Sequence, residues 1–167
     1  DFCLSRGLGD VYKRQGLVGE IYAVMEPFVN MNLEVELGKL GVEVRRTRTT
    51  FFSEWARLGA FNVLSEEKKR LRKFAEPYLK RDVGGHGLES LAEKIRLSRL
   101  DFDGIVHLAP FTCMPEGVAS NIMHSTAESI PVLTILCDEQ LAKAGLLTRL
   151  EAFVDLLRWR RKRLAFV

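Results

Sequence analysis

The sequence of 167 residues contains no uninterrupted apolar stretch that approaches the roughly 20 residues needed to cross a bilayer. Its N-terminal end lacks the charged region, apolar core and cleavage site of a secretory signal. It holds only three cysteines, Cys3, Cys113 and Cys137, which are too few and too scattered for a disulfide framework. These absences argue against a membrane-spanning or disulfide-stabilised secreted protein, so we expect a cytoplasmic location.

The composition is that of a folded domain. With 47% hydrophobic and 28% charged residues, the chain is long enough to bury a core. No internal repeat or low-complexity linker divides it. The basic segment 158–163 is explained by cations at a helix C-terminus, and no aromatic stacking pattern accompanies it. We therefore expect neither nucleic acid nor a membrane among the partners.

The first fifteen residues are different from the rest. The segment CLSRGLGDVYKRQ, residues 3–15, shows no apolar periodicity that joins it to the residues after it, and it resembles the translated sequencing-adapter tail of many metagenomic reading frames. We interpret residues 1–15 as a non-native tail and expect them to pack against nothing. This removes Cys3 from consideration and implies that part of the natural protein lies upstream.

From Gly16 onward, strand-like runs alternate with amphipathic helical patterns. The expected strands span residues 17–24, 42–47, 103–111 and 131–138, and the expected helices span 31–41, 65–81, 88–99, 115–129 and 148–164. Ser65 is expected to cap the second of these helices. This alternation predicts a three-layer, doubly wound α/β domain of the Rossmann or flavodoxin-like type, with four or so mainly parallel strands.

A cysteine at a strand exit is the most informative residue. In open parallel sheets, ligands bind beyond the carboxyl ends of the strands, and Cys113 follows the strand-like run HLAPF at such an end. Pro115 suits the first turn of a helix, whose free amides favour a thiolate. No second cysteine completes a CxxC pair, and position 119 is Ala rather than the Arg of a cysteine-phosphatase loop. Cys113 is therefore a cluster ligand, a nucleophile, or a small buried residue at a tight turn.

A resemblance to a known family lies in three blocks: GEIYAVMEPFVNMNLEVELGKLGVEV, FDGIVHLAPFTCMPEGVASNI and IPVLTILCDEQLAKAGLLTRLEAFVDLL. Together they resemble the C-terminal part of the 2-hydroxyacyl-CoA dehydratase component D-like proteins, relatives of 2-hydroxyglutaryl-CoA dehydratase. The same region occurs in CoA-substrate-specific enzyme activases. The Cys-Met-Pro-Glu turn is the most specific part of the resemblance, which covers nearly all of residues 16–163.

The resemblance implies an oxygen-sensitive iron-sulfur protein of anaerobic metabolism. Residues 16–167 would then form a C-terminal α/β subdomain that shares a 4Fe-4S cluster with an upstream subdomain of the same parent chain. An ATP-hydrolysing activator would deliver an electron at low potential, and an acyl-CoA would be the substrate. Whether the chain is part of an enzyme, a dehydratase-like lyase or reductase component, or an electron carrier is left open.

The resemblance transfers one metal ligand, Cys113, with the partner cysteines expected upstream. The residues expected to bind or line the cofactor share a position at strand exits: Cys113, Glu20, Glu26, Asn30, Pro115, Glu116, Asp138 and Glu139. Asn30 and Asn32 are explained about as well by turn formation and helix capping. Asp138 and Glu139 either orient Arg149 or a ligand, or form a polar loop.

Several alternatives stay open. Cys137 is first a buried core residue and second a second-sphere or ligand thiol. The segment GGHG, residues 84–87, lacks the Gly-Lys-Ser/Thr ending of a phosphate loop and is better explained as a flexible lead-in to a helix. His107 and His124 are single histidines, more typical of core or surface than of ligands. The alternative function is a non-catalytic, doubly wound binding or scaffold module in which Cys113 is structural.

Overall fold

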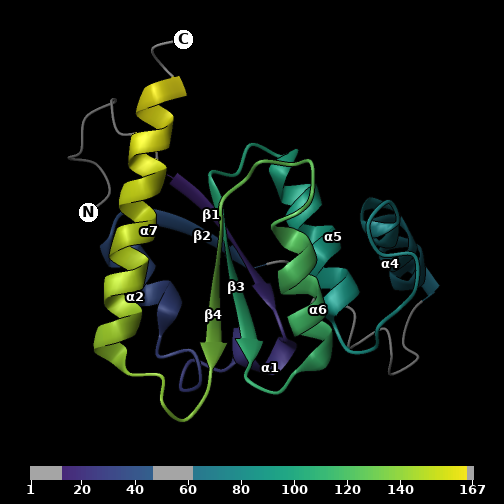
Figure 1. The fold of residues 1–167 in the computed structure, drawn as a ribbon, viewed down its shortest axis with the longest axis horizontal. Helices are drawn as coiled ribbons and strands as arrows, with labels where there is room; N and C mark the ends of the chain where they lie inside the picture. Colours follow the sequence, from purple (N-terminus) through teal and green to yellow (C-terminus); the bar gives the residue numbers. More distant parts are fainter. Residues whose placement is uncertain (1–12, 47–61, 165–167) are drawn as a thin grey trace.

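A four-stranded, all-parallel sheet forms the centre of the molecule (Figure 1). The computed structural model describes residues 13–46 and 62–164. The strands are β1 (Lys13–Gly19), β2 (Val42–Arg46), β3 (Gly104–Pro110) and β4 (Val132–Cys137), in the spatial order β2-β1-β3-β4. Because the order reverses between β1 and β3, crossover connections cover both faces, and the predicted doubly wound α/β fold is confirmed.

Helices cover the two faces of the sheet and the ends of its strands. They are α1 (Ile21–Met25), α2 (Leu33–Lys39), α4 (Asn62–Ala75), α5 (Gly87–Ser98), α6 (Met114–Met123) and α7 (Lys143–Leu164). In Figure 1, α2 and α7 lie on one side of the sheet, α5 and α6 lie on the other, and α4 lies outside α5. The short α1 lies at the end of the sheet toward which the arrows point.

Each face of the sheet has its own apolar core, as alternation along a strand requires. The α7 face gathers Leu17, Val106, Leu108 and Ile135 from the strands, packed against Leu33, Leu37, Leu146, Leu150, Val154 and Leu157. The α5 face gathers Val18 and Ile105, packed against Leu88, Leu91, Ile95, Ala119 and Met123. Strand β3 is buried from Gly104 to Ala109, as is typical of a parallel strand that helices cover on both faces.

The first strand lies earlier in the chain than predicted. The run LVGEIYAV, residues 17–24, is divided between the end of β1 and the helix α1, because Glu20 turns the chain and caps α1 with its carboxylate. Consequently β1 begins at Lys13, inside the segment expected to pack against nothing. That expectation is wrong for residues 13–15, since Lys13 pairs with Val42 and Gln15 is fully buried. Residues 1–12 lie outside the described residues.

The five predicted helices are all present in the predicted order, α1 is a sixth among the described residues that was not predicted, and the ends of the predicted helices differ. The helix α4 begins at Asn62, so Ser65 lies inside it and is not its cap. It ends at Ala75 rather than residue 81, because Pro77 disfavours helical backbone at the residue before it. The helix α6 ends at Met123, and α7 begins at Lys143, five residues before the predicted start at Thr148. Over the stretches that the structure describes, no helix has the length and apolar character to cross a membrane.

Candidate functional site

The ends of β1, β3 and β4 meet at one edge of the sheet, which we call the carboxyl edge and define as residues 19–32, 110–116 and 137–143. The backbone N–H of Glu20 donates to the carbonyl oxygen of Leu108 at 3.1 Å, and that of Phe111 donates to the carbonyl oxygen of Cys137 at 3.2 Å. The predicted meeting of these strand exits at one edge is therefore confirmed, although β1 ends at Gly19 rather than near Val24.

Gly19 allows the chain to turn sharply at the exit of β1. Its φ of 140° lies in the region that favours glycine, and a Cβ there would lie 2.0 Å from the carbonyl oxygen of Leu108. The turn places Glu20 at the start of α1, where its Oε2 accepts a hydrogen bond from the N–H of Ala23 at 3.0 Å. Glu26, at the other end of α1, accepts from the N–H of Phe28 at 3.1 Å. Both expected site carboxylates thus lie at the carboxyl edge and are oriented by local backbone bonds.

Asn30 holds the loop that follows α1. Its side chain is 3% exposed, and its Nδ2 donates to the carbonyl oxygens of Ala23 and Val24 at 3.0 and 3.2 Å. Its Oδ1 accepts from the N–H of Leu33, the first residue of α2, at 3.3 Å. These bonds support the structural interpretation of Asn30 over direct cofactor contact. Asn32 occupies the cap position of α2 with φ of 59° but makes no side-chain cap bond.

Cys113 caps α6 at the exit of β3, as the sequence indicated. Its N–H donates to the carbonyl oxygen of Pro110 and its carbonyl oxygen accepts from Gly117, both at 3.0 Å. The thiol is free of any disulfide, the residue is half-buried, and its side chain makes no cap hydrogen bond. Met114 is the first residue of the helix and Pro115 the second, one position later than expected.

Four large apolar side chains at the carboxyl edge are exposed. Phe28 is 85% exposed and Met114 81%. Tyr22 and Phe111 are also exposed, the first on α1 and the second directly after β3. We call these four residues the apolar rim. Single exposed apolar residues are ordinary on protein surfaces, and here two of them follow β1 and two follow β3, at the same edge of the sheet.

Cys137 lies on the other face of the sheet from α6. It is half-buried and packs against the α7-face core, and burial, with the nearby carboxylates of Asp138 and Glu20, raises the pKa of its thiol to about 11. It lines a mostly apolar cavity of about 490 Å³ together with Phe28, Val29, Met31, Asn32, Asp138 and Lys143. A raised pKa disfavours the thiolate that a metal requires, which supports the core interpretation of Cys137.

The acidic loop after β4 is organised by its own backbone. Asp138 accepts from the N–H of Gln140 at 3.0 Å, and Glu139 is exposed. Arg149 does not pair with either of them. Its guanidinium donates instead to the carbonyl oxygen of Thr134. The hypothesis that these two carboxylates orient Arg149 is therefore wrong, while a polar loop at the strand exit fits the contacts.

Glu116 points into the protein rather than into the crevice. It is fully buried, and its Oε2 lies 2.7 Å from Nε2 of His107, which is also fully buried on β3. Its Oε1 accepts from the hydroxyl of Ser90 on α5 at 3.1 Å. The sequence pattern placed Glu116 near the cofactor and assigned no role to His107. Only the packing of α6 on β3 reveals that they are partners.

Pro115 also faces a neighbouring helix. A Cβ on Gly87, the first residue of α5, would lie 2.2 Å from the carbonyl oxygen of Pro115, and one on Gly85 would lie 3.1 Å from its Cγ. The segment 84–87 is thus a helix lead-in, as preferred from the sequence, whose small residues let the starts of α5 and α6 come together. Pro115 contributes to this packing beside Cys113.

The described part of the chain does not form a complete metal site by itself. Within residues 13–46 and 62–164, no group of three or more His, Cys, Asp or Glu side chains is arranged to hold a metal ion. The carboxyl edge does bring together a half-buried cysteine at a helix start, several carboxylates and the apolar rim. Cysteine thiolate is the donor that iron-sulfur clusters prefer, so the residue fits one ligand position of such a cluster.

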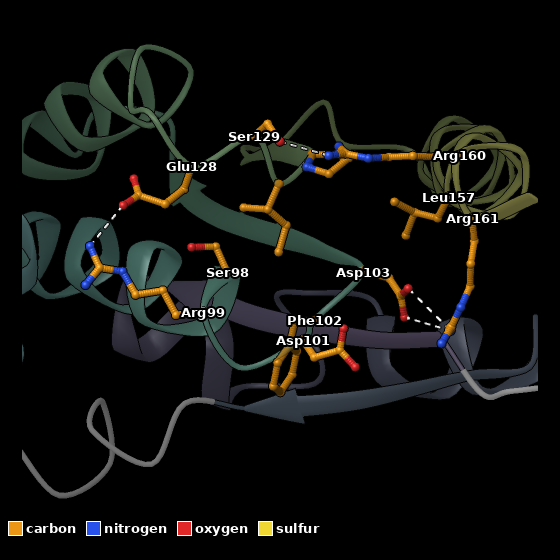
Figure 2. A pocket seen from close by; sticks show the side chains of 12 residues that line it. Ser98, Arg99, Asp101, Phe102, Asp103, Glu128, Ser129, Leu157, Arg160 and Arg161 are labelled. Atoms are coloured by element: carbon orange, nitrogen blue, oxygen red, sulfur yellow. Dashed lines mark hydrogen bonds and ion pairs between the residues drawn. The ribbon is translucent and has the colours of Figure 1, made fainter. Parts of the chain in front are cut away.

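A second hollow lies at the opposite edge of the sheet, which we call the amino edge and define as residues 98–103, 128–131 and 157–161 (Figure 2). Its volume is about 360 Å³. Arg99 pairs with Glu128 at 3.2 Å and Arg161 with Asp103 at 3.4 Å, while Arg160 donates to the hydroxyl of Ser129 at 3.0 Å. Figure 2 shows Arg160 and Arg161 entering from α7 and the other groups from the loops before β3 and β4.

Comparison with known proteins adds no relative: no protein-family model, no curated protein and no solved structure matches this chain.

Proposed function

We propose that this chain is the C-terminal, cluster-bearing α/β subdomain of a larger protein, either a 2-hydroxyacyl-CoA dehydratase-like reductase or a CoA-substrate-specific enzyme activase. In this proposal it takes part in ATP-driven electron transfer at low potential. The observation that carries the proposal is the position of Cys113, a free, half-buried thiol that caps α6 at the carboxyl edge. The resemblance of its Cys-Met-Pro-Glu turn to that family supports the proposal that this cysteine is a cluster ligand.

Cys113 would supply one thiolate ligand. Two local features support this role: the first-turn amides of α6 stabilise negative charge, and the thiol has no disulfide partner among the described residues. A cubane cluster takes about three or four protein ligands. The remaining cysteines would come from an upstream subdomain of the parent chain. When bound, a 4Fe-4S cluster supplies one-electron transfer.

The apolar rim would form the contact with that upstream subdomain. Tyr22, Phe28, Phe111 and Met114 are exposed and lie at the same edge of the sheet as the cysteine. Covering them removes apolar surface from water and excludes water from the thiolate. Such a contact explains why large apolar groups are retained at an edge where strand exits are otherwise polar.

The carboxylates of the carboxyl edge would favour a low potential. Glu20, Glu26, Asp138 and Glu139 all lie at this edge, and negative charge near a cluster makes it harder to reduce. An electron would then have to be delivered by an ATP-hydrolysing activator. The proposed setting is the reducing cytoplasm of an anaerobic cell, with an acyl-CoA as the substrate of the complete protein.

The test is anaerobic reconstitution of the natural full-length protein, followed by iron and sulfide analysis and electron paramagnetic resonance of the reduced sample. The Cys113→Ala variant should lose most of its iron or show an altered cluster signal. Cys137→Ala is the matched control, and it should retain the cluster because its thiol is held protonated within the core. An unchanged cluster in Cys113→Ala would remove the basis of the proposal.

A second candidate function is a non-catalytic binding or scaffold module in which Cys113 is structural. The observation that favours it is the mostly apolar cavity of about 490 Å³ beside Cys137, at the edge where parallel sheets bind ligands. In that case, the natural protein would contain no iron after anaerobic purification and reconstitution. The same experiment therefore separates the two functions.

A further inference from the structure

We infer that the buried pair Glu116–His107 is a positioning device for Cys113, which fixes the first turn of α6 and so the direction of the thiolate. This inference rests on the proposed function, since it concerns how the cluster ligand is oriented. It assigns a role to two buried ionisable residues that the proposed electron transfer does not otherwise use. It also explains why the Glu of the Cys-Met-Pro-Glu turn lies three residues after the cysteine.

The pair is the centre of a buried chain of hydrogen bonds that connects four elements. Glu116 on α6 bonds His107 on β3 through Oε2 at 2.7 Å and Ser90 on α5 through Oε1 at 3.1 Å. His107 Nδ1 lies 3.3 Å from the hydroxyl of Thr134 on β4, which lies 3.2 Å from the hydroxyl of Ser120 on α6. Both ring nitrogens of His107 are therefore engaged, Nε2 by the carboxyl group of Glu116 and Nδ1 by the hydroxyl of Thr134.

These contacts hold the first turn of α6 from two directions. The bond to His107 ties it to the central strand β3, whose exit leads directly to Cys113. The bond from Ser90 ties it to α5, and the close approach of Gly87 to the carbonyl oxygen of Pro115 prevents the two helix starts from moving closer. Because Cys113 makes no side-chain cap bond, the direction of its thiol depends on this backbone.

Stability alone does not account for the pair. Burying two ionisable side chains removes both from water, and an apolar pair of similar size usually stabilises a core as well or better. What the polar pair adds is direction, because a short hydrogen bond accepts one geometry while apolar side chains tolerate several. Glu116 lies in the first turn of α6, so the direction that the pair imposes acts on the turn that follows Cys113.

The experiment uses the natural full-length protein and three variants, each reconstituted anaerobically. Glu116→Gln keeps an oxygen that accepts from His107, whereas the double variant His107→Leu/Glu116→Met replaces both partners with apolar side chains. Lys94→Met is the control, because it removes buried polar contacts from α5 to the hydroxyl of Thr126 and the carbonyl oxygen of Glu128, which lie beyond the C-terminal end of α6 and not at its first turn. Circular dichroism and thermal unfolding show which variants fold, and the reduced cluster is then examined by electron paramagnetic resonance.

We expect Glu116→Gln and Lys94→Met to give the wild-type resonance signal, whatever their melting temperatures. The double variant should fold, but its resonance signal should have displaced g-values. It should also lose iron about tenfold faster on anaerobic dialysis, because removing a group that orients a metal ligand typically weakens metal binding by about this factor. A folded double variant with the wild-type signal and iron retention overturns the inference. Should the double variant not fold, the single variant Ser90→Ala gives the same reading, since it frees one side of Glu116 and should also displace the signal.

The Cys113→Ala variant distinguishes an error in the positioning role of the pair from an error in the proposed function. Loss of the cluster in Cys113→Ala together with a wild-type signal in the double variant overturns only the positioning role. An unchanged cluster in Cys113→Ala overturns both, because no ligand is then left to position.

Discussion

The two edges of the sheet use their charged residues in different ways. At the amino edge, carboxylates pair with arginines from distant parts of the chain: Asp103 with Arg161, Glu128 with Arg99, and Asp101 with Arg14. At the carboxyl edge, Glu20, Glu26 and Asp138 accept hydrogen bonds from backbone N–H groups two or three residues away. The carboxylates of the amino edge therefore connect different elements of the fold. The three carboxylates of the carboxyl edge each order the backbone of their own loop.

This difference suggests how the two edges divide stability and binding. Exposed ion pairs contribute little each, but those at the amino edge connect α5, α7 and the loops before β3 and β4. The three carboxylates of the carboxyl edge make their bonds within their own loops, and this edge carries the exposed apolar rim. The ion pairs of the amino edge connect parts of the domain to one another, and the carboxyl edge leaves apolar side chains exposed. Substitutions at the two edges can test this division.

The largest effect is expected from adding a methyl group at the exit of β1. Gly19→Ala places a Cβ against the backbone oxygen of Leu108 and forces a positive φ on alanine, so it should lower the free energy of unfolding by about 3 kcal/mol or more. The matched change at the amino edge is Gly104→Ala, whose Cβ meets only side-chain atoms of Phe153 and Leu157. Since those side chains can shift, the loss there should be about 1 kcal/mol. Urea unfolding of both variants measures the difference, and equal losses would contradict the strict turn at Gly19.

Reactivity of Cys137 tests the electrostatics of the carboxyl edge. A pKa raised from 9.0 to about 11 reduces the thiolate fraction near pH 8 about a hundredfold, so Cys137 should be alkylated by iodoacetamide about a hundredfold more slowly in the folded than in the unfolded chain. Mass spectrometry of the labelled peptide provides the rate. The Asp138→Asn variant should react faster, because it removes one of the charges that raise the pKa.

The same shift has a consequence for stability, with a definite sign. The folded chain holds the thiol proton more tightly than the unfolded chain, so this contribution is complete below about pH 9 and is lost as the pH rises toward about 11. Urea unfolding at several pH values should show this loss in the wild type and not in Cys137→Ala. A Cys137 that labels as fast as an unfolded thiol would show that burial does not protect it.

The smallest effect is expected at Gln15, on the half of β1 nearer the amino edge. Its side chain is fully buried, and neither its amide nitrogen nor its amide oxygen has a hydrogen-bond partner among the described residues. Replacing it with a similar apolar side chain in Gln15→Met should raise the free energy of unfolding by about 1 to 2 kcal/mol. The exposed Arg45→Met on the neighbouring strand is the control and should change it by less than about 0.5 kcal/mol. A loss of stability in Gln15→Met would show that the amide is satisfied in solution.

Sequence patterns predicted the fold correctly where a pattern is compatible with only one kind of local structure. The strand predicted over residues 103–111 and the change from helix to strand predicted after residue 41 each have a single ready explanation, and both are confirmed. The run LVGEIYAV does not, because a short apolar stretch suits a strand end and a buried helical turn equally. Gly19 and Glu20 inside it were the available signal: a glycine able to turn and a carboxylate able to cap.

Residues of the candidate site could be predicted from the sequence only where their position depends on the end of one strand. Cys113 and Asp138 lie at the carboxyl edge because each follows a parallel strand, and this needs no knowledge of packing. Glu26 also lies there, but after the short helix α1 and not directly after β1. The partners of Glu116 could not be found in this way. His107 and Ser90 come from a strand and a helix whose relative placement is set by the whole α5-face core, so their contact with Glu116 exists only in three dimensions.

The strand order β2-β1-β3-β4 determines the order in which the strands can pair during synthesis. Strand β1 can pair with β2 once residue 46 has been made, but its other neighbour begins only at Gly104. Throughout the synthesis of residues 47–103, one side of the innermost strand therefore has no pairing partner. Such long-range parallel pairing forms slowly and leaves apolar surface open to aggregation. A chaperone that shields the nascent residues 13–19 would thus raise the yield of folded protein more than one that acts after release.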